Sequence, residues 1–203
     1  MQGCFEYEET IVLKKASSGT VEISYIVPLK KESNESLLQF LPTSEAEVAK
    51  KLKSKSKTLA PPREFAYREL EKSEMVDSLF KRKGKVSYKI DFEDSAELEA
   101  ILIGNTSVKA KPKFFQIRRE FPFLADKPNE KSSSGEKKIY SESLRFLKDA
   151  KLNFKIFFPK DSECSTNKGF VGLGSLTYGF LGTETMDPGS SEGKNWEVKI
   201  RFF

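Results

Sequence analysis

Alternation of apolar and polar residues at every second position constrains this chain more than any other feature. The clearest example is the segment 86–92, in which valine, tyrosine, isoleucine and phenylalanine alternate with serine, lysine and aspartate. A period of two places the apolar side chains on one face of a β-strand. Five further segments share this pattern, namely 5–13, 21–27, 114–121, 152–158 and 196–202. The chain is therefore predicted to form a sheet that has one face on a core and one face in solvent.

Helix start signals separate several of these strands. Ser44 with Glu47 forms a capping box that predicts a helix ending near Lys55, and Asp94 with Glu97 predicts a second helix that runs to about residue 102. The spacing of apolar residues predicts two further helices, over 63–83 and 141–150.

These elements predict an α+β fold with a mostly antiparallel sheet of five to six strands and three to four helices packed on one face. A chain of 203 residues fits one domain, so we expect a single domain over 1–203. Residues 1–4 are interpreted as the remnant of a lipid anchor. Serine, glycine and proline predict long loops over 124–138 and 160–194.

Charge argues against a nucleic-acid partner. The chain has 35 basic and 30 acidic residues, and the two signs are interleaved rather than segregated. A nucleic-acid surface would combine basic residues with exposed aromatic residues on one face. The segment 114–119 is the nearest match, and it also fits an ordinary strand. A mixed, solvated surface is the better interpretation.

The absence of histidine from the sequence excludes several kinds of catalytic site. A Ser-His-Asp triad, a Cys-His dyad and a histidine-ligated metal all need this residue. Neighbouring carboxylates such as Glu8 with Glu9, or Asp91 with Glu93, are predicted to lie on wet strand faces. No catalytic residue, metal ligand or cofactor is therefore predicted. A non-enzymatic role is favoured, with a cytosolic enzyme of unknown reaction as an alternative.

The N-terminus contains the pair Gly3-Cys4. It is similar to the end of a bacterial lipobox, in which small residues precede the cysteine that becomes lipidated. Cys4 is therefore predicted to be a lipid anchor. Two alternatives stay open: a buried cysteine in a cytosolic protein, or a disulfide between Cys4 and Cys164.

Several segments carry a resemblance to a known group. The chain after Cys4 reads FEYEE, then a Ser-Gly turn, then TVEISY and Val27-Pro28. This opening resembles uncharacterised bacterial lipoproteins, including the mycobacterial LppM-like group. The strand and helix around 92–102, and the segments 152–159 and 196–198, are similar to the middle and C-terminal parts of that group. The resemblance implies a cell-envelope protein, anchored to a bacterial membrane through Cys4, with lipid or glycolipid as a ligand.

A glycine-rich segment provides the candidate ligand-binding residues. Its glycines lack the strand, helix and Gly-Lys-Ser/Thr context of a phosphate loop. Its large apolar side chains are costly to leave in water, so they either pack on the core or cover an apolar pocket between sheet and helices. The predicted ligand-binding residues are Phe170, Leu173, Tyr178 and Phe180.

Overall fold

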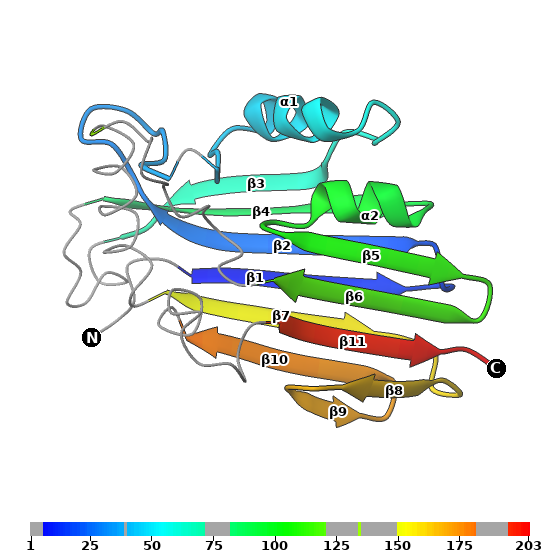
Figure 1. Ribbon diagram of the computed structural model, residues 1–203. Coiled ribbons are helices and arrows are strands. Elements are labelled where there is room, and N and C mark those ends of the chain that lie inside the picture. Colours follow the sequence, from blue (N-terminus) through cyan, green and yellow to red (C-terminus); the bar gives the residue numbers. More distant parts are fainter. Residues whose placement is uncertain (1–5, 39, 72–81, 121–133, 135–149, 182–194) are drawn as a thin grey trace.

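The computed structural model describes residues 6–38, 40–71, 82–120, 134, 150–181 and 195–203. These residues contain eleven strands in two sheets, and two helices. Figure 1 shows the larger sheet as one layer, with the smaller sheet and the helices lying on the same side of it. The prediction of a mostly antiparallel α+β fold with helices on one face is confirmed, but the described part has more strands and fewer helices than predicted.

The larger sheet has seven strands in the order β3-β4-β2-β1-β7-β10-β9. Its central pair is an antiparallel hairpin of β1 (Glu6–Leu13) and β2 (Gly19–Pro28), which correspond to the predicted strands over 5–13 and 21–27. β1 also pairs with β7 (Lys151–Phe157), and this pairing is parallel, whereas the other ladders of the sheet are antiparallel. The remaining strands are β3 (Arg63–Glu69), β4 (Lys83–Phe92), β9 (Phe170–Gly172) and β10 (Ser175–Leu181).

The smaller sheet has four antiparallel strands in the order β5-β6-β11-β8. They are β5 (Thr106–Lys111), β6 (Phe114–Glu120), β8 (Glu163–Thr166) and β11 (Asn195–Arg201). The chain passes from β7 in the larger sheet to β8 in the smaller one and returns to the larger sheet at β9. The inward faces of both sheets supply the core, for example Ile11, Phe154 and Val198.

The predicted helix over 63–83 is wrong for the described part of that range. Residues 63–69 form β3, which pairs with β4. Phe65 and Tyr67 are half-buried at alternate positions, and the ring of Phe65 stacks on Tyr88 with the centroids 6.4 Å apart. Pairing with β4 and this stacking therefore outweigh the local helix pattern. Residues 72–81 lie outside the described part of the chain.

The predicted long loop over 160–194 is also wrong, because it contains β8, β9 and β10. Leu176 and Tyr178 of β10 turn toward the core, while serine, threonine and glycine occupy the intervening positions. Because small residues, one of them glycine, occupy the outward positions, the sequence of β10 was interpreted as a loop. The predicted loop over 124–138 and helix over 141–150 fall outside the described residues, apart from residues 134 and 150.

Both predicted capping boxes are confirmed. Helix α1 (Glu45–Lys55) starts at Ser44, whose side chain accepts a hydrogen bond from the Glu47 amide. Helix α2 (Ser95–Ile101) starts at Asp94, whose carboxylate accepts a 2.8 Å hydrogen bond from the Glu97 amide. These caps satisfy amide groups that have no partner inside the helix.

Removing the second cap is expected to weaken the fold modestly. Asp94→Ala should lower the free energy of unfolding by about 1 kcal/mol, because it leaves the Glu97 amide without its acceptor. Urea denaturation would measure this loss. Glu93→Ala is the matched control, since only the backbone amide of Glu93 joins the capping contacts. An equal loss in both variants would show that the cap has no specific effect.

Candidate functional site

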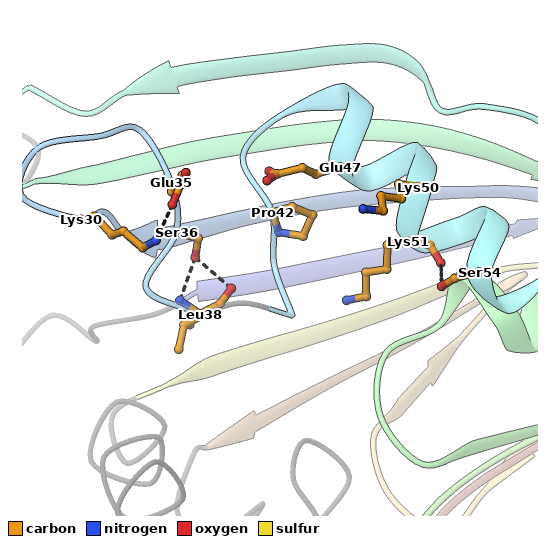
Figure 2. A pocket seen from close by; sticks show the side chains of 9 residues that line it. All are labelled: Lys30, Glu35, Ser36, Leu38, Pro42, Glu47, Lys50, Lys51 and Ser54. Atoms are coloured by element: carbon orange, nitrogen blue, oxygen red, sulfur yellow. Dashed lines mark hydrogen bonds and ion pairs between the residues drawn. The ribbon is translucent and has the colours of Figure 1, made fainter. Parts of the chain in front are cut away.

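A pocket of about 480 Å³ opens between the segment 29–44 and helix α1. Figure 2 shows how its walls are arranged, with side chains of α1 on one side and the 29–44 segment on the other. The lining combines apolar groups, charged groups and hydroxyl groups. The residues that line it are Lys30, Glu35, Ser36, Leu38, Pro42, Glu47, Lys50, Lys51 and Ser54.

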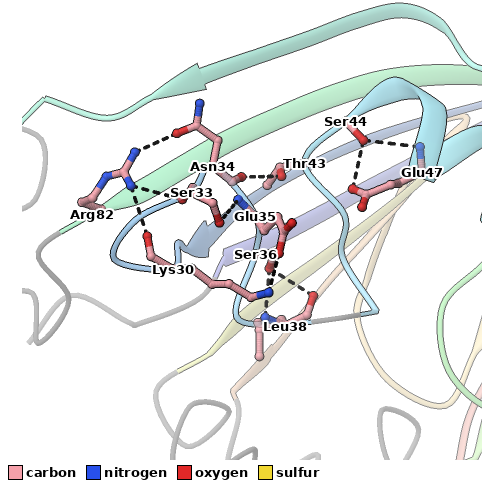
Figure 3. A network of polar contacts seen from close by, with 10 residues as sticks. All are labelled: Lys30, Ser33, Asn34, Glu35, Ser36, Leu38, Thr43, Ser44, Glu47 and Arg82. Atoms are coloured by element: carbon pink, nitrogen blue, oxygen red, sulfur yellow. Dashed lines mark hydrogen bonds and ion pairs between the residues drawn. The ribbon is translucent and has the colours of Figure 1, made fainter.

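Polar contacts hold the 29–44 wall in place (Figure 3). The guanidinium of Arg82 donates to the carbonyl oxygens of Lys30 and Ser33, at 3.1 Å each, and to the side-chain oxygen of Asn34 at 2.7 Å. The Thr43 hydroxyl donates to the Asn34 carbonyl oxygen at 2.5 Å. A wall that is fixed before a ligand arrives loses little conformational freedom on binding.

Hydrogen bonds of Ser36 fix the part of this segment that leads to Leu38. The Ser36 hydroxyl accepts a hydrogen bond from the Leu38 amide at 2.9 Å and donates to the Leu38 carbonyl at 3.0 Å. A bridge between Leu29 and Ser36 closes the segment on itself. Leu38 is thereby positioned as an apolar part of the pocket lining (Figure 2).

The charges of the pocket are unevenly paired. Glu35 forms an ion pair with Lys30, and the carboxylate of Glu47 accepts a 2.9 Å hydrogen bond from the Ser44 hydroxyl. The ammonium of Lys51 donates to the Phe40 carbonyl oxygen. Among the described residues, no carboxylate pairs with Lys50 or Lys51. The pocket therefore has an excess of positive charge on its α1 side.

Lys51 is half-buried, and burial changes its acidity. Removal from water disfavours the charged ammonium, and the nearby charge of Lys55 disfavours it further, so the pKa of Lys51 falls to about 8. Burial also lowers the pKa of Lys55, whose ammonium donates to the Leu102 carbonyl at 3.1 Å. An anion in the pocket would stabilise the charged form of Lys51.

Among the described residues, packed side chains leave little space between α1, α2 and β4. A void of about 20 Å³ lies between α1, α2 and β4, lined by residues such as Leu52, Tyr88 and Ile101. Such a void holds about one water molecule. An acyl chain would therefore need α1 or α2 to move before it could enter between sheet and helices.

The predicted ligand-binding residues differ in how far they are exposed. Phe170 and Leu173 are each 78% exposed. The ring of Tyr178 faces the core, with its centroid 5.6 Å from that of Trp196. The backbone of Phe180 pairs with Leu152, and its side chain lies outside what the structure describes. Phe170 and Leu173 are therefore exposed to solvent, whereas Tyr178 packs against the core.

A buried ion pair joins the two sheets, and the sequence interpretation missed it. Glu9 of β1 and Arg119 of β6 are 1% and 0% exposed and form a salt bridge. The Tyr7 hydroxyl donates to the Glu9 carboxylate at 3.0 Å. The guanidinium carbon of Arg119 lies 4.1 Å from the centre of the Phe154 ring. The prediction that Glu9 lies on a wet face is thus wrong.

The alternation of apolar and polar residues along β1 and β6 could have predicted this buried ion pair. Glu9 occupies the same face of β1 as Tyr7 and Ile11, and Arg119 occupies the same face of β6 as Ile117. Opposite charges at inward positions of two strands indicate a buried pair. Burial raises the pKa of Glu9, while Arg119 and Tyr7 oppose the shift.

The sequence model of the LIC11874-like family matches residues 1–203. This chain belongs to the LIC11874-like family. Among solved structures, this LIC11874-like protein is similar to the folded domain of LppM from Mycobacterium tuberculosis, determined by NMR. The identity is 12%, the TM-score is 0.47, and the match covers 100% of this chain and 92% of that chain. The sequence motifs loosely resemble the LppM-like group, and this LppM domain is among the solved structures to which the chain is similar. No curated protein matches.

Other features of the LIC11874-like protein concern metals, membranes and thiols. In the described ranges, no group of three or more acidic, cysteine or histidine residues could hold a metal ion. The described helices include none with the length and apolar character to cross a membrane. Cys164 is a half-buried free thiol whose pKa burial raises to about 11. Cys4 lies outside the described residues.

Proposed function

We propose that this LIC11874-like protein is a lipid-anchored protein of the bacterial cell envelope with a non-enzymatic binding role. The observation that carries the proposal is the position of Gly3-Cys4, which directly precedes the central strand of the larger sheet. β1 begins at Glu6 and is flanked by β2 and β7. Only Phe5 separates Cys4 from Glu6, so a lipid on Cys4 would lie at most about 7 Å along the chain from the start of β1. The domain would therefore be held close to the membrane surface.

The pocket lies at the same end of the sheet as the start of β1. Glu6 pairs with Ile26, close to the end of β2, and the 29–44 wall follows directly after β2. Figure 1 shows the start of β1 and the 29–38 segment at the same end of the layer. An anchor on Cys4 would therefore place the pocket near the bilayer, where it could bind molecules of the envelope.

The anchor can be tested in cells that produce the protein naturally. We expect the protein to enter the detergent phase of a Triton X-114 extract and Cys4→Ala to remain in the aqueous phase, because the variant lacks the acyl acceptor. Cys164→Ala is the matched control and should partition like the unchanged protein. Aqueous partitioning of the unchanged protein would contradict the anchor.

A second candidate function is the carriage of a lipid or glycolipid. The observation that favours it is the apolar lining supplied by Leu38 and Pro42 in a pocket at the anchored end. The void of about 20 Å³ behind this lining limits the role, because a tail must displace a helix to enter. A fluorescent fatty acid would bind with micromolar affinity if carriage occurs. Absence of binding at millimolar probe would exclude it.

A further inference from the structure

We infer that the pocket between the 29–44 segment and α1 binds the phosphate group of a small organic molecule through the ammonium groups of Lys50 and Lys51. The inference names a ligand class for the proposed binding role and rests on that role, but it does not depend on lipidation of Cys4. The phosphate could belong to a soluble metabolite or to a lipid head group, since both present the same chemistry to the pocket.

Charge selects an anion. Three lysines (Lys30, Lys50 and Lys51) and two glutamates (Glu35 and Glu47) line the pocket, so its net charge is positive. Glu35 is ion-paired with Lys30, and Glu47 accepts a hydrogen bond from the neutral Ser44 hydroxyl. Lys50 and Lys51 are neighbours on α1 and form no ion pair with a described carboxylate, so together they outweigh the single charge of Glu47 on this side of the pocket. A lysine ammonium recognises phosphate as a point charge, so this side of the pocket suits a phosphate group.

The half-buried position of Lys51 strengthens the argument. Its ammonium has three N–H donors, and the Phe40 carbonyl accepts from one of them. Two donors are therefore left for a ligand. Burial has removed part of the hydration of this ammonium, and an anion would replace that lost solvation. The interaction would also be screened less by salt than one at a fully exposed lysine.

Size indicates that the phosphate carries an organic group. The pocket measures about 480 Å³, within the range of small-molecule sites of about 300–1,000 Å³. A bare phosphate would leave most of that volume to water. Leu38 and Pro42 offer apolar surface in the same pocket, where carbon atoms attached to the phosphate can lie.

Titration with glycerol 3-phosphate and with inorganic phosphate at low salt would test this inference. The amide chemical shifts of Leu38 and Lys51 should change on binding. Calorimetry should show that glycerol 3-phosphate binds at least threefold more tightly than inorganic phosphate. Lys50→Gln combined with Lys51→Gln should weaken binding of glycerol 3-phosphate at least tenfold. Lys53→Gln is the matched control, because Lys53 is exposed on α1 and does not line the pocket, and it should bind within twofold of the unchanged protein.

A pH series provides a readout that a purely structural role of Lys51 would not change. The charged groups around Lys51 are Lys50, Lys55 and Glu47 on α1, with Lys30 and Glu35 on the opposite wall of the pocket. Because the pKa of Lys51 is about 8, affinity for glycerol 3-phosphate should fall severalfold between pH 7 and pH 9. The double variant, which lacks Lys51, should lose this step.

Vesicles separate the two sources of phosphate. Vesicles of phosphatidylcholine with phosphatidylglycerol should bind the protein, and the double variant should bind them less than Lys53→Gln does, if the pocket takes a lipid head group. Binding of glycerol 3-phosphate without a variant-dependent vesicle effect assigns the pocket to a soluble phosphate. If the double variant and Lys53→Gln bind every probe equally, or if nothing binds at millimolar concentration, the inference is wrong. Detergent partitioning through Cys4 would be unaffected by either result.

Discussion

Glu9→Gln is expected to lower the free energy of unfolding by about 3–5 kcal/mol, because it removes the negative charge of Glu9 from the buried guanidinium of Arg119. Both residues are almost fully buried between the sheets, so water cannot replace the missing charge. Urea denaturation at pH 7 would measure the loss. Replacing both residues, as in Glu9→Leu with Arg119→Met, should cost less than the sum of the two single changes.

The matched control for this prediction is Glu8→Gln. Glu8 is the neighbouring residue on β1 and is exposed on the opposite face. Its replacement should change the free energy of unfolding by less than about 0.5 kcal/mol. Equal effects of Glu8→Gln and Glu9→Gln would contradict a buried ion pair between the sheets.

The same pair predicts how stability depends on pH. Burial raises the pKa of Glu9, and Arg119 opposes this shift, so Arg119→Met should raise the pKa further. The folded variant then keeps a proton that the unfolded chain releases near the ordinary value of about 4.5. Because the folded state binds more protons, stability falls as pH rises above this value. The cost of Arg119→Met should therefore be smaller at pH 5 than at pH 8, and a larger cost at pH 5 would contradict the assignment.

Trp196→Ala is expected to cost about 3–5 kcal/mol in the free energy of unfolding. Trp196 is 1% exposed and its ring lies 5.6 Å from the rings of both Phe154 and Tyr178. Its indole nitrogen donates to the Lys168 carbonyl at 3.1 Å. The variant thus creates a cavity between the sheets and removes a hydrogen bond. Loss of the intrinsic tryptophan signal makes circular dichroism the appropriate probe of urea denaturation.

Phe170→Ala is the control for the tryptophan change. Phe170 is also a large aromatic residue, but it is 78% exposed on β9. Its removal should change stability by less than about 0.5 kcal/mol. A cost below about 1 kcal/mol for Trp196→Ala, or an equal cost for both variants, would show that the packing between the two sheets is not as described.

Local patterns predicted the parts of the fold that depend on local chemistry. Alternation predicted β4 and β11, and the capping residues Ser44 and Asp94 predicted the starts of both described helices. Alternation also predicted that one face of the 196–202 strand lies on the core, and in the structure the Trp196 ring on that face packs on β7 and β10. The partner of a buried face depends on the sheet order, which alternation along one strand does not contain.

Long-range pairing explains what the sequence did not predict. The parallel contact of β1 with β7 joins segments about 145 residues apart, and no local signal specifies it. β3 and β10 are stabilised by their neighbours β4 and β7, while their own residues fit a helix or a loop equally well. The predictions of a helix and a loop for the segments that contain β3 and β10 were therefore wrong, because pairing with neighbouring strands decides their structure.

The candidate site was predicted least well, for the same reason. The pocket gathers Lys30 and Glu35 from a segment after β2 with Lys50 and Lys51 from α1, and only the tertiary fold brings these walls together. Each of these residues looks like ordinary surface charge in the sequence. Arg82 donates to three backbone carbonyl oxygens of the 29–44 segment, and it lies about 50 residues further along the chain than the residues that carry them.

The most direct test of the central proposal is the mass of the N-terminal peptide of the protein isolated from its natural cells. The envelope-anchor account predicts a peptide that begins at Cys4 and carries acyl chains on that residue. An N-terminal peptide in which Cys4 is unmodified, or joined by a disulfide to Cys164, would contradict the account.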